Sequence, residues 1–158
     1  MEEKAFAERR FVVDSMLGKM AKWLRVLGFD ARYEHLKRQA QVQTYLAEGY
    51  LVITRNQRWC PYQGVMCVRA NDPMEQLREA IAKLSVTPDE VRLLQRCIVC
   101  NEPLNQLLRE EAFGLVPDYV FETHTMFYQC AQCRRIYWPG SHPGRMLKRL
   151  QDVLGWVP

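Results

Sequence analysis

The chain has 158 residues, of which 48% are hydrophobic and 25% charged, and it carries a formal net charge of +4. This length favours one domain or one domain with a small module, and the composition is that of an ordinary folded protein. No apolar run is long enough to span a bilayer, and the charged start MEEKAFAERR lacks the apolar core of a signal peptide. We therefore expect a cytoplasmic protein with no membrane partner.

Strand and helix patterns alternate along the first part of the chain. Short β-forming runs predict strands over 11–14, 30–34, 50–54 and 64–70. Apolar residues at helical spacing predict helices over 15–28, 39–49, 71–84 and 87–95. The third helix is the clearest, because Asp72, Pro73 and Glu75 form a complete start signal. Thr87 and Pro88 open the fourth helix in the same way.

This alternation predicts an α/β fold, in which helices sandwich a parallel sheet. The pattern changes at Cys97, where short strands, turns and cysteines follow, and a last helix is expected over 144–154. We therefore divide the chain into an N-terminal extension (1–10), an α/β domain (11–95), and a small metal-binding module with the C-terminal helix (96–158).

Four of the six cysteines form two Cys-x-x-Cys pairs, which we call the first knuckle (97–100) and the second knuckle (130–133). In a chain without an export signal, reduced thiols that hold a metal are a better interpretation than disulfides. Cys97, Cys100, Cys130 and Cys133 are the predicted ligands of a closed structural Zn²⁺ site, as in a zinc ribbon. A disulfide pair and an iron–sulfur centre are the alternatives. Cys60 and Cys67 are left without a partner pattern.

Basic residues gather in two regions of the sequence. Lys19, Lys22 and Arg25 lie within two turns of the first predicted helix, and Arg134 and Arg135 follow the second knuckle. Such groups can bind phosphate, although a solvated helix face is the plainer interpretation. Aromatic residues surround the second knuckle and could stack on bases or pack the core of the ribbon. These aromatic residues are Phe127, Tyr128, Tyr137 and Trp138.

Polar residues follow three of the predicted strands. Asp14 ends the first strand, Asn56 follows the third, and Asp72 follows the fourth. Because ligands bind at the carboxyl ends of strands in open α/β sheets, these side chains are candidates for a catalytic site. Several carboxylates there would hold Mg²⁺ or Mn²⁺ and activate water against a phosphodiester. The alternative for Asp14 and Asp72 is a helix cap.

Three segments together resemble a known family. They are FVVDSMLGKMAKWLRVLGFDARY, LVITRN, and the knuckles with RRIYWPGSHPGRM. They resemble the PIN-like ribonuclease domain with a C-terminal zinc ribbon, a family named after the C-terminal part of the Mut-seven exonuclease. The resemblance extends from about Phe11 to Leu150. It implies a PIN-like α/β sandwich, a zinc ribbon, RNA as partner and metal-dependent ribonuclease activity.

The resemblance also identifies what this chain lacks. Asp14 matches the first acid of the family, but the acid expected at the start of the second helix falls on Arg38 or Gln39. The family also has an acid at the end of a Thr-Arg-Asp motif. At that position this chain has Asn56, which follows Arg55. Asn56 brings no negative charge to offset the dehydration of Mg²⁺ or Mn²⁺. Arg38 would weaken metal binding further and would instead suit a phosphate.

Other family positions are present. Lys19, Lys22 and Arg25 match the basic first helix of the family, and His142 lies in its Trp-x-Gly-Ser-His segment. His142 could act as a general acid or base, contact phosphate, or serve as a structural hinge.

The sequence therefore favours an RNA-binding protein with a degenerate catalytic site, in which Arg55, Arg134 and Arg135 join the basic first helix. An active ribonuclease is the alternative, in which Asp14 works with substitute carboxylates from Glu34, Asp30 or Glu48. A protein-interaction adaptor, docking through the zinc ribbon, is the second alternative. Whether the protein is an enzyme stays open at this point, and so does a homodimer.

Overall fold

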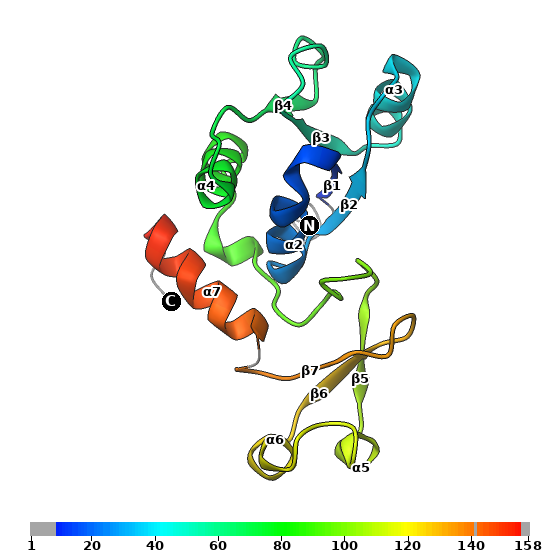
Figure 1. Cartoon of the computed structure of the whole chain (residues 1–158), viewed down its shortest axis with the longest axis vertical. Coiled ribbons are helices and arrows are strands. Elements are labelled where there is room, and N and C mark those ends of the chain that lie inside the picture. The colour runs from blue at the N-terminus through cyan, green and yellow to red at the C-terminus, as the bar shows by residue number, and fades with distance from the viewer. Residues whose placement is uncertain (1–8, 141, 156–158) are drawn as a thin grey trace.

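The structure is a computed structural model that describes residues 9–140 and 142–155. It consists of an α/β part and a small antiparallel ribbon (Figure 1). No helix in these described ranges is both long and apolar enough to cross a bilayer.

The α/β part contains a four-stranded sheet with the order β2-β1-β3-β4. Its strands are β1 (Arg10–Asp14), β2 (Asp30–Glu34), β3 (Leu51–Thr54) and β4 (Val65–Cys67). All three pairings are parallel, which confirms the predicted α/β class. Parallel strands need a crossover on a face of the sheet, and the helices between the strands provide it.

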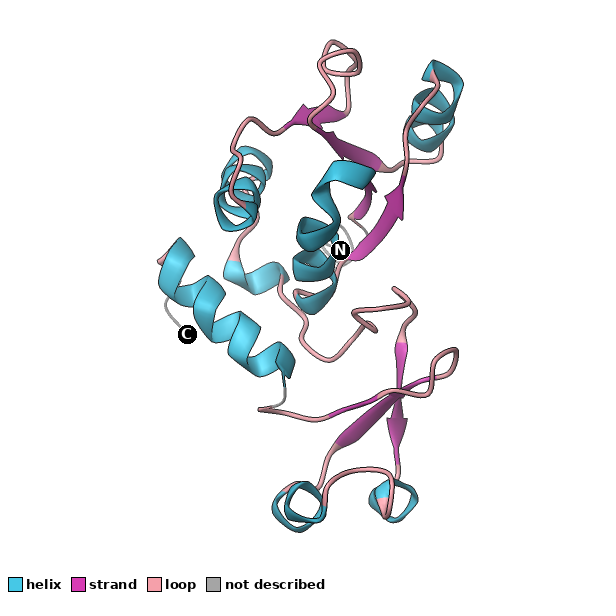
Figure 2. Cartoon of the chain, viewed as in Figure 1, coloured by secondary structure: helices cyan, strands magenta, loops and turns pink. Residues whose placement is uncertain are grey.

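Helices cover both faces of the sheet (Figure 2). Phe11, Val13 and Ile53 point to one face, where they pack with α2 (Gly18–Val26), α4 (Pro73–Leu84) and α7 (His142–Leu154). Val12 and Val52 point to the other face, which is covered by α3 (Gln39–Ala47) and the loop after β3. Since side chains alternate along a strand, Asp14 and Thr54 share the face of Val12 and Val52.

The ribbon consists of β5 (Leu104–Leu107), β6 (Phe127–Cys130) and β7 (Ile136–Tyr137), which pair antiparallel. Two short helices, α5 (Arg109–Ala112) and α6 (Asp118–Thr123), lie between β5 and β6 at the end far from the sheet (Figure 1). We call residues 108–126 the ribbon tip. Several of its large apolar side chains are exposed, namely Leu108, Phe113, Leu115, Tyr119 and Met126.

Helix α7 follows the ribbon in the sequence but packs on the α/β part. It contacts α2 and α4, and Leu150 is fully buried in the core that these helices share with the sheet. The sequence grouped this helix with the zinc module. The sequence could not reveal its position, because an amphipathic helix shows which of its faces is apolar but not which core that face joins.

The helix predicted over 87–95 is wrong. Only a 3₁₀ turn, Pro88–Glu90, forms there, and Val91 is extended. The backbone N–H of Arg92 donates to the carbonyl of Leu27 at 2.9 Å, so after the 3₁₀ turn the chain bonds to the end of α2 instead of continuing as a helix. The start signal at Thr87 and Pro88 therefore begins one turn and no more.

Cys60 and Cys67 form a disulfide, with their Cα atoms 5.6 Å apart. The sequence left both residues without a partner pattern. The disulfide joins the loop after β3 to the last residue of β4. Strand register brings the pair together, since Thr54, at the start of that loop, lies beside Cys67 in the sheet.

Candidate functional site

Asp14 lies at the carboxyl end of β1, as the sequence predicts, and is only 3% exposed. Its carboxylate accepts hydrogen bonds from Ser15 N at 2.8 Å, Leu36 N at 3.2 Å and Thr54 Oγ1 at 2.7 Å. The bond from Ser15 caps the 3₁₀ turn Ser15–Leu17. Burial of a carboxylate requires such partners, because an unpaired charge in the interior is costly. Asp14 therefore has a complete structural role.

Two loops close over Asp14. The loop after β2 donates the Leu36 N–H to Asp14, and the Leu36 carbonyl in turn accepts from Trp59 Nε1 at 3.3 Å. Leu36 and Trp59 are both buried. The loops that enclose the Asp14 carboxylate are therefore held in place by the packing of Leu36 and Trp59.

Asn56 and Asp72 are engaged in local turns. Asn56 Oδ1 accepts from Arg58 N at 3.0 Å, which is an Asx-type turn. Asp72 Oδ2 accepts from Met74 N at 3.0 Å and Glu75 N at 3.2 Å and is the N-cap of α4. Of the two interpretations of Asp72, the helix cap is the one that the observed hydrogen bonds agree with.

The candidate replacement acids lie in different places. Glu34 pairs in register with Asp14 at the carboxyl end of β2. Asp30 pairs with Arg10 at the amino end of the same strands, and Glu48 precedes β3, so both lie toward the opposite edge. Across the described residues, the four knuckle cysteines are the only group of three or more potential ligands close enough to hold a metal ion.

Cationic side chains occupy the loops at the carboxyl edge of the sheet. Lys37 and Arg38 lie in the loop after β2, Arg55 and Arg58 in the loop after β3, and Arg69 after β4. All are exposed except Arg55, which is partly buried and donates to Asn71 Oδ1 at 2.6 Å. These three loops contain no acid before Asp72. We call the five residues the basic rim.

The basic first helix divides into two kinds of residue. Lys19 and Lys22 are exposed on α2. Arg25 is buried, and its guanidinium donates to the carbonyls of Ala31 at 2.9 Å and Ile98 at 2.8 Å. Arg25 therefore joins α2, β2 and the first knuckle and does not belong to an exposed basic face. Arg134 and Arg135 are exposed beside the second knuckle.

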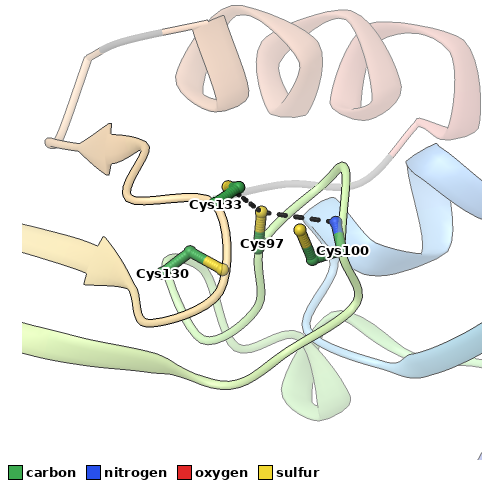
Figure 3. Close-up of side chains that lie close together, drawn as sticks. All are labelled: Cys97, Cys100, Cys130 and Cys133. Atoms are coloured by element: carbon green, nitrogen blue, oxygen red, sulfur yellow. Dashed lines mark hydrogen bonds between the residues drawn. The ribbon is translucent and has the colours of Figure 1, made fainter.

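The four knuckle cysteines converge on one point (Figure 3). Their sulfur atoms all lie within 4.8 Å of one another, and those of Cys97 and Cys133 are 3.6 Å apart. A Zn–S bond of about 2.3 Å places the sulfur atoms of a tetrahedral site about 3.8 Å apart. Four thiolates without an open position suit structural Zn²⁺, and the geometry here fits that ion.

Tyr137 supports the cluster from behind. Its hydroxyl lies 3.2 Å from Cys97 Sγ and accepts from Ile98 N. Burial raises the pKa of Cys97, but hydrogen bonds from Tyr137 and from the Cys100 and Val99 N–H groups outweigh it and lower the pKa to about 7. Burial raises the pKa of Cys100 to about 12, an effect that a bound cation would oppose.

The aromatic residues around the second knuckle mostly pack the ribbon. Phe127 and Tyr137 are buried, and Tyr128 and Trp138 are partly buried against neighbouring clusters. Core packing was one of the two interpretations of these residues. The sequence identified Tyr137 as an aromatic residue near the knuckle, but nothing in the sequence assigned its hydroxyl to Cys97.

Sequence reasoning also missed Thr54 and Asn101 as site residues. Thr54 immediately precedes the Arg-Asn pair, so its place at a strand end was a usable signal. Asn101 follows the first knuckle with a positive φ of 63° and bonds to β2. The side chain of His142 and all of Ser141 lie outside the described residues, so the role of His142 stays a prediction.

Comparison with known proteins gives one match. A family model for the Mut7-C RNAse domain matches residues 9–150. Searches of curated proteins and of solved structures find no match. The match includes both the sheet with its enclosed Asp14 and the ribbon with its four cysteines. The chain therefore belongs to the Mut7-C RNase domain family and has a ribonuclease-like domain with a four-cysteine site that can bind zinc.

Proposed function

We propose that the protein binds RNA along the carboxyl edge of its sheet and that Asp14 no longer supports robust cleavage. The observation that carries this proposal is the state of Asp14. Its carboxylate is buried and has three protein donors, and Glu34 is its only acidic neighbour in the adjoining strand. Mg²⁺ and Mn²⁺ require several anionic oxygens, and this set does not offer them.

The basic rim supports RNA as the ligand. The three loops at the carboxyl edge of the sheet carry five cations, whereas Asp14 at the same edge is buried. Lys19 and Lys22 extend this charge along α2, and membership of a ribonuclease family agrees with RNA. Phosphates attract such a surface, and displaced counterions make the affinity fall as salt is added.

Binding is tested by fluorescence polarisation with a labelled RNA over a range of salt concentrations. The double variant Lys37→Gln/Arg58→Gln removes one cation from each of two rim loops. For single strands, each lost phosphate contact lowers the slope of log affinity against log salt by about 0.7. Arg78→Gln is the control, because Arg78 is exposed on α4 outside the rim. An unchanged slope in the rim variant would contradict the proposal.

Cleavage is tested on zinc-loaded protein with added Mn²⁺ or Mg²⁺, beside Asp14→Ala and Asn56→Asp. We expect the wild type to retain RNA without cutting it. Cleavage that Asp14→Ala abolishes would instead favour the active ribonuclease, with Asp14 and Glu34 as its carboxylates. Activity gained by Asn56→Asp would identify the missing acid, because the substitution restores one negative charge at the carboxyl edge.

The exposed apolar side chains of the ribbon tip favour a second candidate, a protein-interaction adaptor. This candidate predicts no retention of RNA at physiological salt. The same polarisation experiment therefore distinguishes it from the RNA-binding protein.

A further inference from the structure

A polar groove lies where the α/β part meets the first knuckle. Its volume is about 560 Å³. One wall is β2, with Arg32, Tyr33 and Glu34, and the other is the segment around the knuckle, with Arg96, Asn101 and Glu102. We call this space the junction groove. None of the functions above uses it.

The base of the groove is fixed by hydrogen bonds between the two parts of the chain. Asn101 Oδ1 accepts from Ala31 N at 3.0 Å, and Asn101 Nδ2 donates to Asp30 Oδ1 at 2.7 Å. Arg25 bonds both Ala31 and Ile98 from below. These contacts satisfy an edge of β2 that has no neighbouring strand. The groove is therefore pre-formed, which lowers the cost of ordering it around a ligand.

Tyr33 connects the groove to the candidate site. Its hydroxyl donates to the Ser15 carbonyl beside Asp14, while the side chain remains 48% exposed. Gly18 leaves room for this position, because a Cβ atom there would lie 3.3 Å from the ring. The next residue, Glu34, lies opposite Asp14 in the register of β1 and β2. An open aromatic ring is thus held between the groove and the edge that carries the basic rim.

The charges of the groove do not suit a phosphate chain. Its lining includes Arg25, Arg32 and Arg96, but also Asp30, Glu34 and Glu102. Arg25 is committed to backbone carbonyls, and Arg96 donates to the Asn101 carbonyl at 2.8 Å. Arg32 and Glu34 form an ion pair with each other at 3.7 Å. The lining therefore offers no free cationic track, and its exposed feature is the ring of Tyr33, whose face can stack on a nucleobase.

We propose that the junction groove receives unpaired bases of a single RNA strand, with Tyr33 as the stacking surface and the basic rim holding the phosphates. The inference rests on the proposed function and adds the class of RNA. Bases within a duplex are stacked on each other, so they do not reach such a ring. Single-strand binders commonly combine a cationic track with aromatic side chains in this way.

The test compares a labelled single-stranded oligouridine with a blunt RNA duplex of equal nucleotide number, using the zinc-loaded 158-residue chain. We expect tighter binding of the single strand. Tyr33→Ala should weaken single-strand binding by about tenfold or more, the usual effect of losing one stacked base, and leave duplex binding unchanged. Tyr33→Phe should retain the affinity. Tyr119→Ala is the control, because Tyr119 is an exposed tyrosine of the ribbon tip.

A second measurement reports base stacking directly. An oligonucleotide that carries a fluorescent adenine analogue should lose emission on binding to wild type, because stacking quenches the analogue, and Tyr33→Phe should quench it equally. Equal affinity for the single strand and the duplex, an unaffected Tyr33→Ala, or unchanged emission would each overturn the inference. If these results occur while the rim variant still weakens binding, RNA binding stands and only the groove assignment fails. If no RNA binds at low salt, both fail.

Discussion

Thr54 Oγ1 donates a 2.7 Å hydrogen bond to Asp14 Oδ2, and both side chains are buried at the ends of neighbouring strands. The bond joins β3 to β1 at the edge where a ribonuclease-like site is expected. It also uses one of the lone pairs with which that oxygen could bind a metal ion. Asp14 therefore stabilises the end of the sheet, and the bonds that do so are made by the same carboxylate that a catalytic metal ion would need.

Replacing Thr54 with Val keeps the shape of the side chain and removes its hydroxyl, which donates to Asp14 and accepts from Asn56 N at 3.0 Å. We expect a loss of about 1–3 kcal/mol in the free energy of unfolding, because a buried carboxylate oxygen loses its partner. Urea denaturation followed by circular dichroism measures the change. Thr44→Val is the matched control, since Thr44 bonds a helix carbonyl at an exposed position. Equal losses in both variants would contradict a special role for Thr54.

Glu90 should make stability depend on pH. Burial raises the pKa of its carboxyl, an effect that Arg9 partly opposes at 3.4 Å. Because the folded pKa exceeds the unfolded value, the contribution to stability is full below the ordinary pKa of about 4.5 and is lost as pH rises through the folded pKa. Glu90→Gln should therefore gain stability relative to wild type as the pH is raised.

Denaturation curves over a pH series check this result. Glu75→Gln serves as the comparison, because Glu75 is exposed and makes only a surface ion pair with Arg78. A difference in the free energy of unfolding between wild type and Glu90→Gln that stays constant across the pH series would contradict a raised pKa for Glu90.

Tyr137→Phe should weaken zinc binding without removing a ligand. The hydroxyl group supports the Cys97 sulfur at 3.2 Å, and loss of such an outer contact commonly costs about tenfold to hundredfold in metal affinity. Competition with a chromophoric chelator measures the affinity. Tyr128→Phe is the control, since Tyr128 also packs against the cluster. An affinity equal to wild type would show that the bond is dispensable.

Removal of zinc should also disturb the junction between the two parts of the chain. The first knuckle provides Ile98 and Asn101, which bond to Arg25 and to β2. Hydrogen exchange at the Ala31 amide, which donates to Asn101, should therefore speed up after chelation. The Val13 amide, in the central part of the sheet, provides the internal reference. Equal protection of Ala31 with and without zinc would show that the knuckle is ordered without its metal.

The Cys60–Cys67 disulfide predicts a specific pattern of thiol labelling. Under non-reducing conditions, alkylation of the denatured, zinc-free chain should modify the four knuckle cysteines and leave this pair unlabelled. Reduction should lower stability by about 2–3 kcal/mol, the cost of freeing a short loop. Mass spectrometry and denaturation provide the two measurements. A Cys60→Ser/Cys67→Ser variant that matches oxidised wild type in stability would contradict the second expectation.

The sequence by itself determined the class of fold and the four cysteines that can bind a metal ion. Buried strand runs alternating with amphipathic helices allow few arrangements other than a parallel sheet, and the spacing of two Cys-x-x-Cys pairs selects four of the six cysteines as one set. Asp14 was also identified, because a polar residue that ends a buried strand is a local signal. The absence of acids at Arg38 and Asn56 could likewise be read directly from the sequence.

Only the tertiary structure decided how distant residues are used. The burial of Arg25, the position of α7 on the sheet and the bond from Thr54 to Asp14 join residues far apart in the chain. The Cys60–Cys67 pair is closer in sequence, but it depends on the register of β3 and β4. Local propensity contains no information about such partners, because each depends on strand register and on which surfaces pack together. For this reason the sequence named an acid and a basic helix, whereas the structure determined that the acid is enclosed and that one of the helix cations holds the ribbon.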